Sequence, residues 1–249
     1  VQFVYMENVK LLRATRDDVF PLIFNPNHLD VTKGFIEDLI GKEIKNIVIN
    51  NTKEIERDNI DQKKGILDLQ VEIENNELID VEVQIEEIPA FENRLLFYNN
   101  KLFTNSVKRG TDGYLKAKKT IVIAIINYPL ELTKDIPDFI TKYRYQEINY
   151  NFELTNMQEI DIIELPKIRK LKDFSDVISQ WMIFLDSPNS EEAKKAMVDN
   201  EKIKRAQEVL EEISQDPELE RSLDIQEKWE LDRKTAIAYA RMQGEDRKS

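Results

Sequence analysis

Two neighbouring segments decide the fold: Ile66–Glu74 (ILDLQVEIE) and Ile79–Ile85 (IDVEVQI). From Leu67 onward both alternate apolar residues with acids or amides. Successive side chains of a β-strand point to opposite faces of a sheet, so this period of two predicts two half-buried strands. The residues between them, Asn75-Asn76-Glu77, favour a turn. We therefore expect an antiparallel hairpin with one apolar face and one polar face.

The hairpin brings acidic residues together on its polar face. Directly opposed residues share a face, so the apolar sets coincide only when paired residue numbers sum to an even value. A three-residue loop gives a sum of 152 and sets Asp68 opposite Gln84, whereas a sum of 150 sets Asp68 opposite Glu82. Either register places the three residues within about 5–8 Å of one another between Cβ atoms. This face suits a metal site, although alternating Asp and Glu also form ordinary solvent-exposed faces.

Composition limits the chemistry that the 249 residues can support. The chain has no cysteine and one histidine, His28, which excludes thiolate and multi-histidine metal sites. A metal held by oxygen ligands is expected to be Mg²⁺, with Mn²⁺ as a second possibility. With six glycines and no GxGxxG or P-loop motif, we expect no organic cofactor. No apolar run of 18 residues and no signal peptide is found, so we expect a cytoplasmic protein without membrane association.

The formal net charge of −12 hides a local change of sign. Between Gly65 and Asn93 there are nine acids and no base, whereas Arg94–Lys119 contains seven bases and one acid. An acidic segment followed by a basic one suits a metal site beside a phosphate-binding surface. It also suits an ordinary solvated hairpin followed by a basic helix.

Periodicity outside the hairpin predicts the remaining elements. Pro21 limits a helix within Thr15–Phe24 to about one turn, with Thr15 or Asp17 as its cap. The other expected strands are Ile44–Asn50, Thr120–Asn127, Gln146–Leu154 and Ile160–Leu165. A helix is expected after Pro89, with Phe91, Leu95, Tyr98 and Leu102 facing inward. The other expected helices are Asp30–Ile40, Asp176–Leu185, Ser190–Val198, Glu201–Ser214 and Pro217–Arg241. We expect two regions, residues 1–168 and an all-helical region 169–249.

Several segments together resemble one family. They are Asp17–Phe20 (DDVF), Lys63–Leu69 (KKGILDL), Val81–Gln84 (VEVQ), Phe91–Tyr98 (FENRLLFY), Val107–Gly110 (VKRG), Ile121–Ile126 (IVIAII) and Ile163–Lys167 (IELPK). The combination resembles the recombination-promoting nuclease/putative transposase family of the PD-(D/E)XK superfamily. That superfamily has a core of helix, three-stranded meander, helix and strand. The resemblance implies an α+β fold with a restriction-endonuclease-like core, a central mixed sheet flanked by helices, and an all-α C-terminal extension.

The resemblance also assigns roles by motif position. It implies that Asp68 and Glu82 bind the metal together with the backbone carbonyl of Val83. Gln84 stands at the superfamily's lysine position, and an amide cannot accept a proton as a lysine can. Asp17 matches an acidic position near the site, where it has either a catalytic or a capping role. The expected nucleic-acid contacts are Lys63, Lys64, Arg94, Lys101, Lys108 and Arg109; Arg94 contacts phosphate or pairs with neighbouring acids.

The expected function is a Mg²⁺-dependent DNA endonuclease that promotes recombination through breaks. The alternative is a catalytically weak relative that binds DNA or protein, which the overall acidity and Gln84 favour. A nuclease acting on RNA is a third possibility. A single-site nuclease usually needs two protomers to cut both strands, so a homodimer through the helical region would fit. For the binding alternative, the helical region supplies an interaction surface with Trp181, Phe184 and Leu185 as anchors, unless these residues belong to the core.

Overall fold

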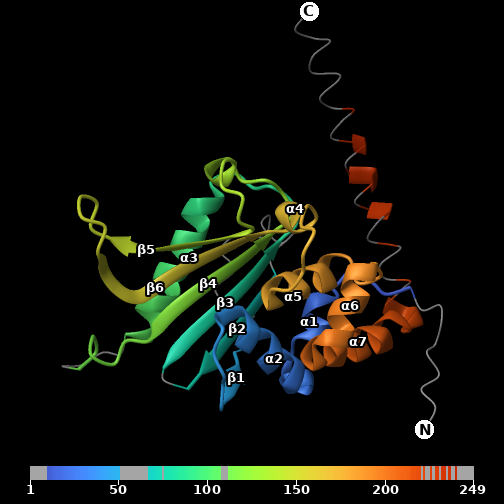
Figure 1. Cartoon of the computed structure of the whole chain (residues 1–249), viewed down its shortest axis with the longest axis horizontal. Helices are drawn as coiled ribbons and strands as arrows, with labels where there is room; N and C mark the ends of the chain where they lie inside the picture. The colour runs from blue at the N-terminus through green and yellow to red at the C-terminus, as the bar shows by residue number, and fades with distance from the viewer. Residues whose placement is uncertain are drawn as a thin grey trace, which may run out of the picture.

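The structure is a computed structural model that describes residues 10–50, 67–74, 76–107, 112–219 and part of 221–239, with the backbone alone at residues 67 and 68. A six-stranded mixed sheet forms its centre, in the order β1-β2-β3-β4-β6-β5 (Figure 1). The strands are β1 (Ile47–Ile49), β2 (Leu67–Ile73), β3 (Glu77–Gln84), β4 (Lys119–Ile126), β5 (Ile140–Gln146) and β6 (Glu153–Glu164). The first three strands form an antiparallel meander, and β4 and β6 join it in parallel.

The predicted hairpin is β2 and β3, and its register sets Asp68 opposite Glu82. The sum of 150 is therefore observed and the sum of 152 is wrong. The reason is that Glu77 belongs to β3, where it pairs with Ile73, instead of to the loop. Asn76 takes a left-handed backbone with φ of 59°, which asparagine tolerates better than most residues.

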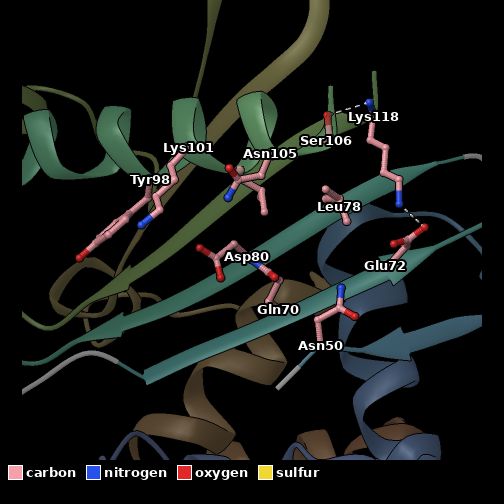
Figure 2. Close-up of a pocket in the computed structure, with 11 residues that line it drawn as sticks. Asn50, Gln70, Glu72, Leu78, Asp80, Tyr98, Lys101, Asn105, Ser106 and Lys118 are labelled. Carbon is pink, nitrogen blue, oxygen red and sulfur yellow. Dashed lines mark hydrogen bonds and ion pairs between the residues drawn. The ribbon is translucent and has the colours of Figure 1, made fainter. Parts of the chain in front are cut away.

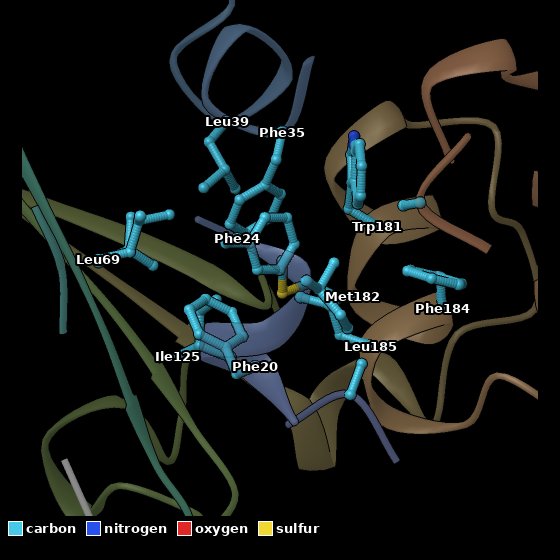
Figure 3. Close-up of a cluster of buried hydrophobic side chains, with 14 of the residues drawn as sticks. Phe20, Phe24, Phe35, Leu39, Leu69, Ile125, Trp181, Met182, Phe184 and Leu185 are labelled. Carbon is cyan, nitrogen blue, oxygen red and sulfur yellow. The ribbon is translucent and has the colours of Figure 1, made fainter. Parts of the chain in front are cut away.

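One face of the sheet is covered by a layer of helices: α1 (Phe20–Ile23), α2 (Leu29–Ile40), α5 (Val177–Asp186), α6 (Glu191–Asp199) and α7 (Glu201–Ser214). Phe20, Phe35 and Trp181 pack against Leu69 and Ile125 of the sheet in the main apolar core (Figure 3). The Trp181 indole Nε1 donates a hydrogen bond to the Asp38 carboxylate over 2.8 Å, which satisfies its polar atom. Trp181 is therefore a core residue in this structure, and it is fully buried.

The opposite face is covered by α3 (Phe91–Ser106), which packs on β4 and β6. Phe91, Leu95 and Leu102 are buried as predicted, but Tyr98 is only half-buried and Asn99 takes the inward position. Asn99 is satisfied there, because its Nδ2 donates to the Glu159 carbonyl over 2.8 Å and its Oδ1 accepts from Thr120 Oγ1 over 2.6 Å. The polar face of the β2–β3 hairpin lies beside this helix.

The boundaries of α2, α5, α6 and α7 agree closely with those predicted from the sequence. Gly41 ends α2 in a left-handed conformation with φ of 64°. Asp176, Ser190 and Asn200 cap α5, α6 and α7 by accepting backbone hydrogen bonds. Val19 precedes α1 without a side-chain cap, so neither Thr15 nor Asp17 caps that helix. The described residues between 217 and 239 are helical, and the proposed division near residue 168 stays a prediction although α5–α7 share the core of the sheet.

The strand predicted at Gln146–Leu154 is wrong. β5 ends at Gln146, and the chain turns before β6 begins at Glu153. The Glu147 carboxylate accepts from the Asn149 and Tyr150 amides, and Asn151 has φ of 58°, so local polar side chains stabilise a turn. The strand expected at Ile160–Leu165 is the end of the much longer β6.

Three short helices complete the described chain: η1 (Pro26–His28), η3 (Glu131–Thr133) and α4 (Leu165–Ile168). α4 follows β6 directly, with a proline in its first turn, where the missing N–H is not needed. Within the described residues, no helix is long and apolar enough to cross a membrane.

Candidate active site

The centre of the candidate site is the cross-strand pair of Asp68 and Glu82. Glu82 lies on β3, between β2 and β4, and only 4% of its surface is exposed. Residues directly opposed in an antiparallel pair have Cβ atoms about 4.5–5.5 Å apart. That separation allows two carboxylates to share one Mg²⁺ at its usual ligand distance of about 2.0–2.1 Å. The register makes Asp68 and Glu82 direct partners in the backbone, whereas the Asp68 side chain lies outside the described residues, so metal binding by the pair stays a prediction.

The neighbours of Glu82 on this face are also polar and buried. Gln70 and Asp80 form the adjacent cross-strand pair, and Gln84 follows Glu82 on β3. Each of these four described side chains, Glu82 included, is at most 9% exposed. The polar face of the hairpin is therefore not a solvated surface, which was the simplest alternative. Burying carboxylates is costly unless they are paired or bind a cation, so a buried row of this kind points to chemistry.

The neighbour of Glu82 on its other side is small. Ala124 of β4 is its partner in the parallel pairing, and the larger Val122 and Ile126 are the partners of Asp80 and Gln84. Phe91 and Leu95 of α3 pack in the same apolar cluster as Ala124. Glu82 therefore has a methyl group beside it on β4 instead of a branched side chain.

Gln84 and Val83 keep their predicted positions at the end of β3. The Gln84 amide Nε2 donates to the Glu86 carbonyl over 2.7 Å, which holds the side chain in place and leaves its Oε1 as the acceptor. An oxygen acceptor can orient a water but cannot accept its proton at neutral pH. The Val83 side chain is fully buried against the helical layer, on the face opposite Glu82, and its proposed carbonyl ligation stays a prediction.

Arg94 lies in the first turn of α3, and its guanidinium carbon is 5.2 Å from the centre of the Tyr98 ring. Its Nε and Nη2 atoms are buried, and no described residue accepts a hydrogen bond from them. Sequence left two roles open for Arg94, phosphate contact or pairing with neighbouring acids. Among the described residues no acid forms an ion pair with it, and its contact with phosphate stays a prediction.

A pocket of about 260 Å³ lies between α3 and the polar face, over the Gln70–Asp80 pair (Figure 2). Tyr98, Lys101 and Asn105 of α3 line it together with Gln70 and Asp80 of the hairpin, and the nucleic-acid contact of Lys101 stays a prediction. Sequence reasoning did not single out Gln70, Asp80, Tyr98 or Asn105. The alternating pattern had placed the first two on the right face, but nothing in it distinguished them from solvated residues.

Part of the basic segment is neutralised by ion pairs. Lys118 pairs with Glu72 at 2.5 Å, Lys116 with Asp112 at 3.1 Å, and Lys119 approaches Glu159 at 3.6 Å. These three lysines are therefore weaker candidates for phosphate contact than the charge count suggests.

The remaining predicted residues are Asp17, Lys63, Lys64, Lys108 and Arg109. Lys63, Lys64, Lys108 and Arg109 lie outside the described residues, so their predicted contacts with nucleic acid stay predictions. Asp17 is exposed in the turn before α1, a helix that packs on the other face of the sheet. Its catalytic role therefore also stays a prediction.

Tyr128, which sequence reasoning missed, follows β4 and lies under the start of α3. Its ring packs edge-to-face on Phe91 with centroids 5.8 Å apart. Burial, followed by the negative charges of Glu87 and Glu92, raises the pKa of its hydroxyl above the ordinary value of 10. The phenol therefore stays protonated and can donate a hydrogen bond over the whole physiological pH range.

Comparison with known proteins agrees with this geometry. Neither curated proteins nor solved structures gave a significant match to the chain. A family model, described as PD-(D/E)XK nuclease family transposase, matches residues 15–240. That match spans most of the chain and includes the meander, α3, β4 and the helical layer. The chain therefore belongs to the PD-(D/E)XK nuclease family transposases.

Proposed function

We propose that this chain is a Mg²⁺-dependent deoxyribonuclease, an endonuclease that hydrolyses phosphodiester bonds in DNA and promotes recombination through the breaks. The observation that carries the proposal is the register of β2 and β3, which makes Asp68 and Glu82 direct partners within a buried polar row. Mn²⁺ would suit the same oxygen ligands. The absence of cysteine from the sequence is compatible with a reducing cytoplasm, where we place the activity.

Each residue of the site has a task in such a reaction. Asp68 and Glu82, with the Val83 carbonyl, would hold a divalent cation, which offsets phosphate charge and lowers the pKa of a bound water. Gln84 would orient the attacking water through its free Oε1 atom. Arg94 would bind a phosphate oxygen with its buried N–H groups. Lys101 would bind the backbone of the substrate along the rim of the pocket.

The second candidate is a catalytically weak relative that acts by binding DNA or protein. The observation that favours it is the hydrogen bond from Gln84 to the Glu86 carbonyl, because an amide held in this way supplies no general base. This candidate requires neither metal affinity nor cleavage.

Cleavage of supercoiled plasmid with Mg²⁺ or Mn²⁺ separates the two candidates. We expect nicking or linearisation by the wild type, its loss with EDTA, and its loss in Asp68→Asn and Glu82→Gln. Glu208→Gln, an exposed acid-to-amide change on α7, is the matched control and should cut normally. A wild type that binds DNA without cutting it would favour the second candidate. A wild type that cuts RNA but not DNA would show that the substrate is RNA.

The same protein should be sized in solution with and without DNA. If both strands are cut in one event, we expect two protomers, because each chain carries one such site. Light scattering that shows a monomer together with double-strand cuts would contradict the dimer.

A further inference from the structure

Tyr128 is buried and Arg94 is half-buried, and both carry hydrogen-bond donors for which no described residue offers an acceptor. Tyr128 is 7% exposed, and its hydroxyl has no hydrogen-bond partner in the part of the chain that is described. The Nε and Nη2 atoms of Arg94 are buried and equally unpartnered among those residues. Native proteins pair nearly all buried polar atoms, so unpaired donors that lie close together require an explanation.

The two side chains are neighbours. Tyr128 packs on Phe91, and Arg94 is three residues further along the same helix, which places it on the adjoining part of the same face. Arg94 and Glu82 are both close enough to the Tyr128 hydroxyl to change its pKa, Arg94 lowering it and Glu82 raising it. The unpaired donors therefore lie around the same end of the sheet as the Asp68–Glu82 pair.

The chemistry of these donors selects an anion. Arginine has no acceptor atom, and its planar fork matches the oxygens of a phosphate or carboxylate. The neighbouring acids Glu87 and Glu92 are exposed, so solvent screens them more than it screens the buried donors. α3 begins at Phe91 without a side-chain cap, so the positive end of the helix adds to the attraction.

We propose that the Tyr128 hydroxyl and the Arg94 guanidinium together bind one phosphate group of the nucleic-acid backbone next to Glu82. This proposal rests on the proposed function, since it adds a hydrogen-bond donor from the segment after β4 to the phosphate contact already proposed for Arg94. Tyr128 acts as a hydrogen-bond donor that positions the phosphate. It neither binds the metal nor accepts a proton.

The test begins with inorganic phosphate and does not depend on cleavage. Thermal unfolding is followed in phosphate and in chloride at equal ionic strength for the wild type, Tyr128→Phe, Arg94→Gln and the double variant. Phosphate stabilises many proteins by exclusion from their surface, so the readout is the difference between variants. Tyr143→Phe is the matched control, because Tyr143 also packs at the α3 cluster and is half-buried.

We expect phosphate to raise the melting temperature of the wild type and of Tyr143→Phe more than that of Tyr128→Phe or Arg94→Gln. The double variant should lose no more than the stronger single variant, because both groups bind the same ligand. Equal phosphate effects in the wild type and Tyr128→Phe would overturn the proposal. An equal loss in Tyr128→Phe and Tyr143→Phe would overturn it too.

The second arm measures plasmid cleavage, which separates a backbone site from a site for free phosphate. Tyr128→Phe should lower kcat/KM about tenfold, as expected for one hydrogen bond to a charged group. Tyr143→Phe should cut at the wild-type rate. If Tyr128→Phe loses the phosphate effect but cuts normally, the site binds free anions and not the substrate. A wild type that never cuts, yet responds to phosphate through Tyr128, contradicts the proposed nuclease but not the anion site.

Discussion

The two faces of the meander are made by the same strands but serve different purposes. On one face, Leu69, Val71, Val81 and Val83 are buried in the main core against the helical layer. On the other, Gln70, Asp80, Glu82 and Gln84 are equally buried but polar. Neighbouring residues on one strand therefore face different environments, so changes on the two faces should separate stability from activity.

The largest expected effect separates Glu82 from Val81, its neighbour in sequence. Glu82→Gln should lower cleavage at least about 1000-fold, as the loss of an essential catalytic group does elsewhere, without lowering the melting temperature. Val81→Ala should cost about 2 kcal/mol in the free energy of unfolding and leave kcat within a few fold. Plasmid cleavage and urea denaturation measure the two quantities. If Glu82→Gln and Val81→Ala lose similar amounts of activity and of stability, the two faces do not serve different purposes.

Trp181 tests the apolar face alone. It is fully buried against Phe35 and Phe184, with ring centroids 5.0 and 6.0 Å away. Trp181→Ala should cost about 3–5 kcal/mol of stability through the cavity and the lost Asp38 hydrogen bond. Trp181→Phe, which keeps most of the volume, should cost less. A near-neutral Trp181→Ala in denaturant titrations would show that the helical layer does not support the sheet.

The same face of the sheet carries two buried acids on β6, Asp161 and Glu159, whose partners on β4 are Ile123 and Ile121. Burial and nearby Glu159, only partly offset by the ion pair with Lys142, raise the pKa of the Asp161 carboxyl from 3.8 to about 6. Arg144 and Lys119 also approach Glu159. The pKa of Asp161 is higher in the folded state than in the unfolded state. Its contribution to the free energy of unfolding is therefore fully present below about pH 4 and is lost as the pH rises through about 6.

Asp161→Asn should remove that loss. The difference between the pKa values of 3.8 and about 6 corresponds to about 3 kcal/mol in the free energy of unfolding, and the charges of the neighbouring groups reduce this figure. We therefore expect the variant to gain stability relative to the wild type between pH 4 and 7, and then to keep a constant difference. Urea denaturation at several pH values measures this, and Glu153→Gln, a neighbouring exposed acid, is the control. A difference that is flat or falls with pH would contradict the direction.

The smallest expected effect is at Lys101 of α3, which lines the pocket over the polar face. Lys101→Ala should weaken DNA binding and lower the slope of log K against log salt by about one, because one phosphate contact is lost. Lys116→Ala, which breaks an exposed ion pair with Asp112, should change neither the slope nor the stability by more than about 0.5 kcal/mol. If the two variants have equal slopes of log K against log salt, Lys101 does not contact the phosphates of the DNA.

How far sequence predicts this fold differs between its elements. The β2–β3 hairpin follows from alternation alone, because a shift by one residue would exchange its faces. Alternation cannot choose between registers that differ by two, and here the choice depended on whether Glu77 belongs to the strand. In the β5–β6 region alternation failed, because Ile148 and Tyr150 alternate within a turn and are 88% and 83% exposed. The hydrogen bonds of Glu147 decide that turn.

The site divides in the same way. Asp68, Glu82 and Gln84 are found by their spacing on strands, and Arg94 by its place in the family motif. Tyr128 could not be found, because it lies outside any regular element and its role depends on the packing of α3 over the end of β4. Asn99 was missed for a related reason, since its inward position depends on partners from two distant strands.

Ala124 has a consequence for how such a chain can lose its activity. The residue beside Glu82 on β4 carries no functional group and is fully buried in the apolar cluster under α3. Valine in its place would keep every acid, amide and cation of the site, and would raise the β-propensity of the strand. Two added methyl groups would nevertheless overpack a fully buried position next to Glu82. A relative with a complete set of catalytic side chains can therefore be inert because of a neighbour with no chemistry of its own.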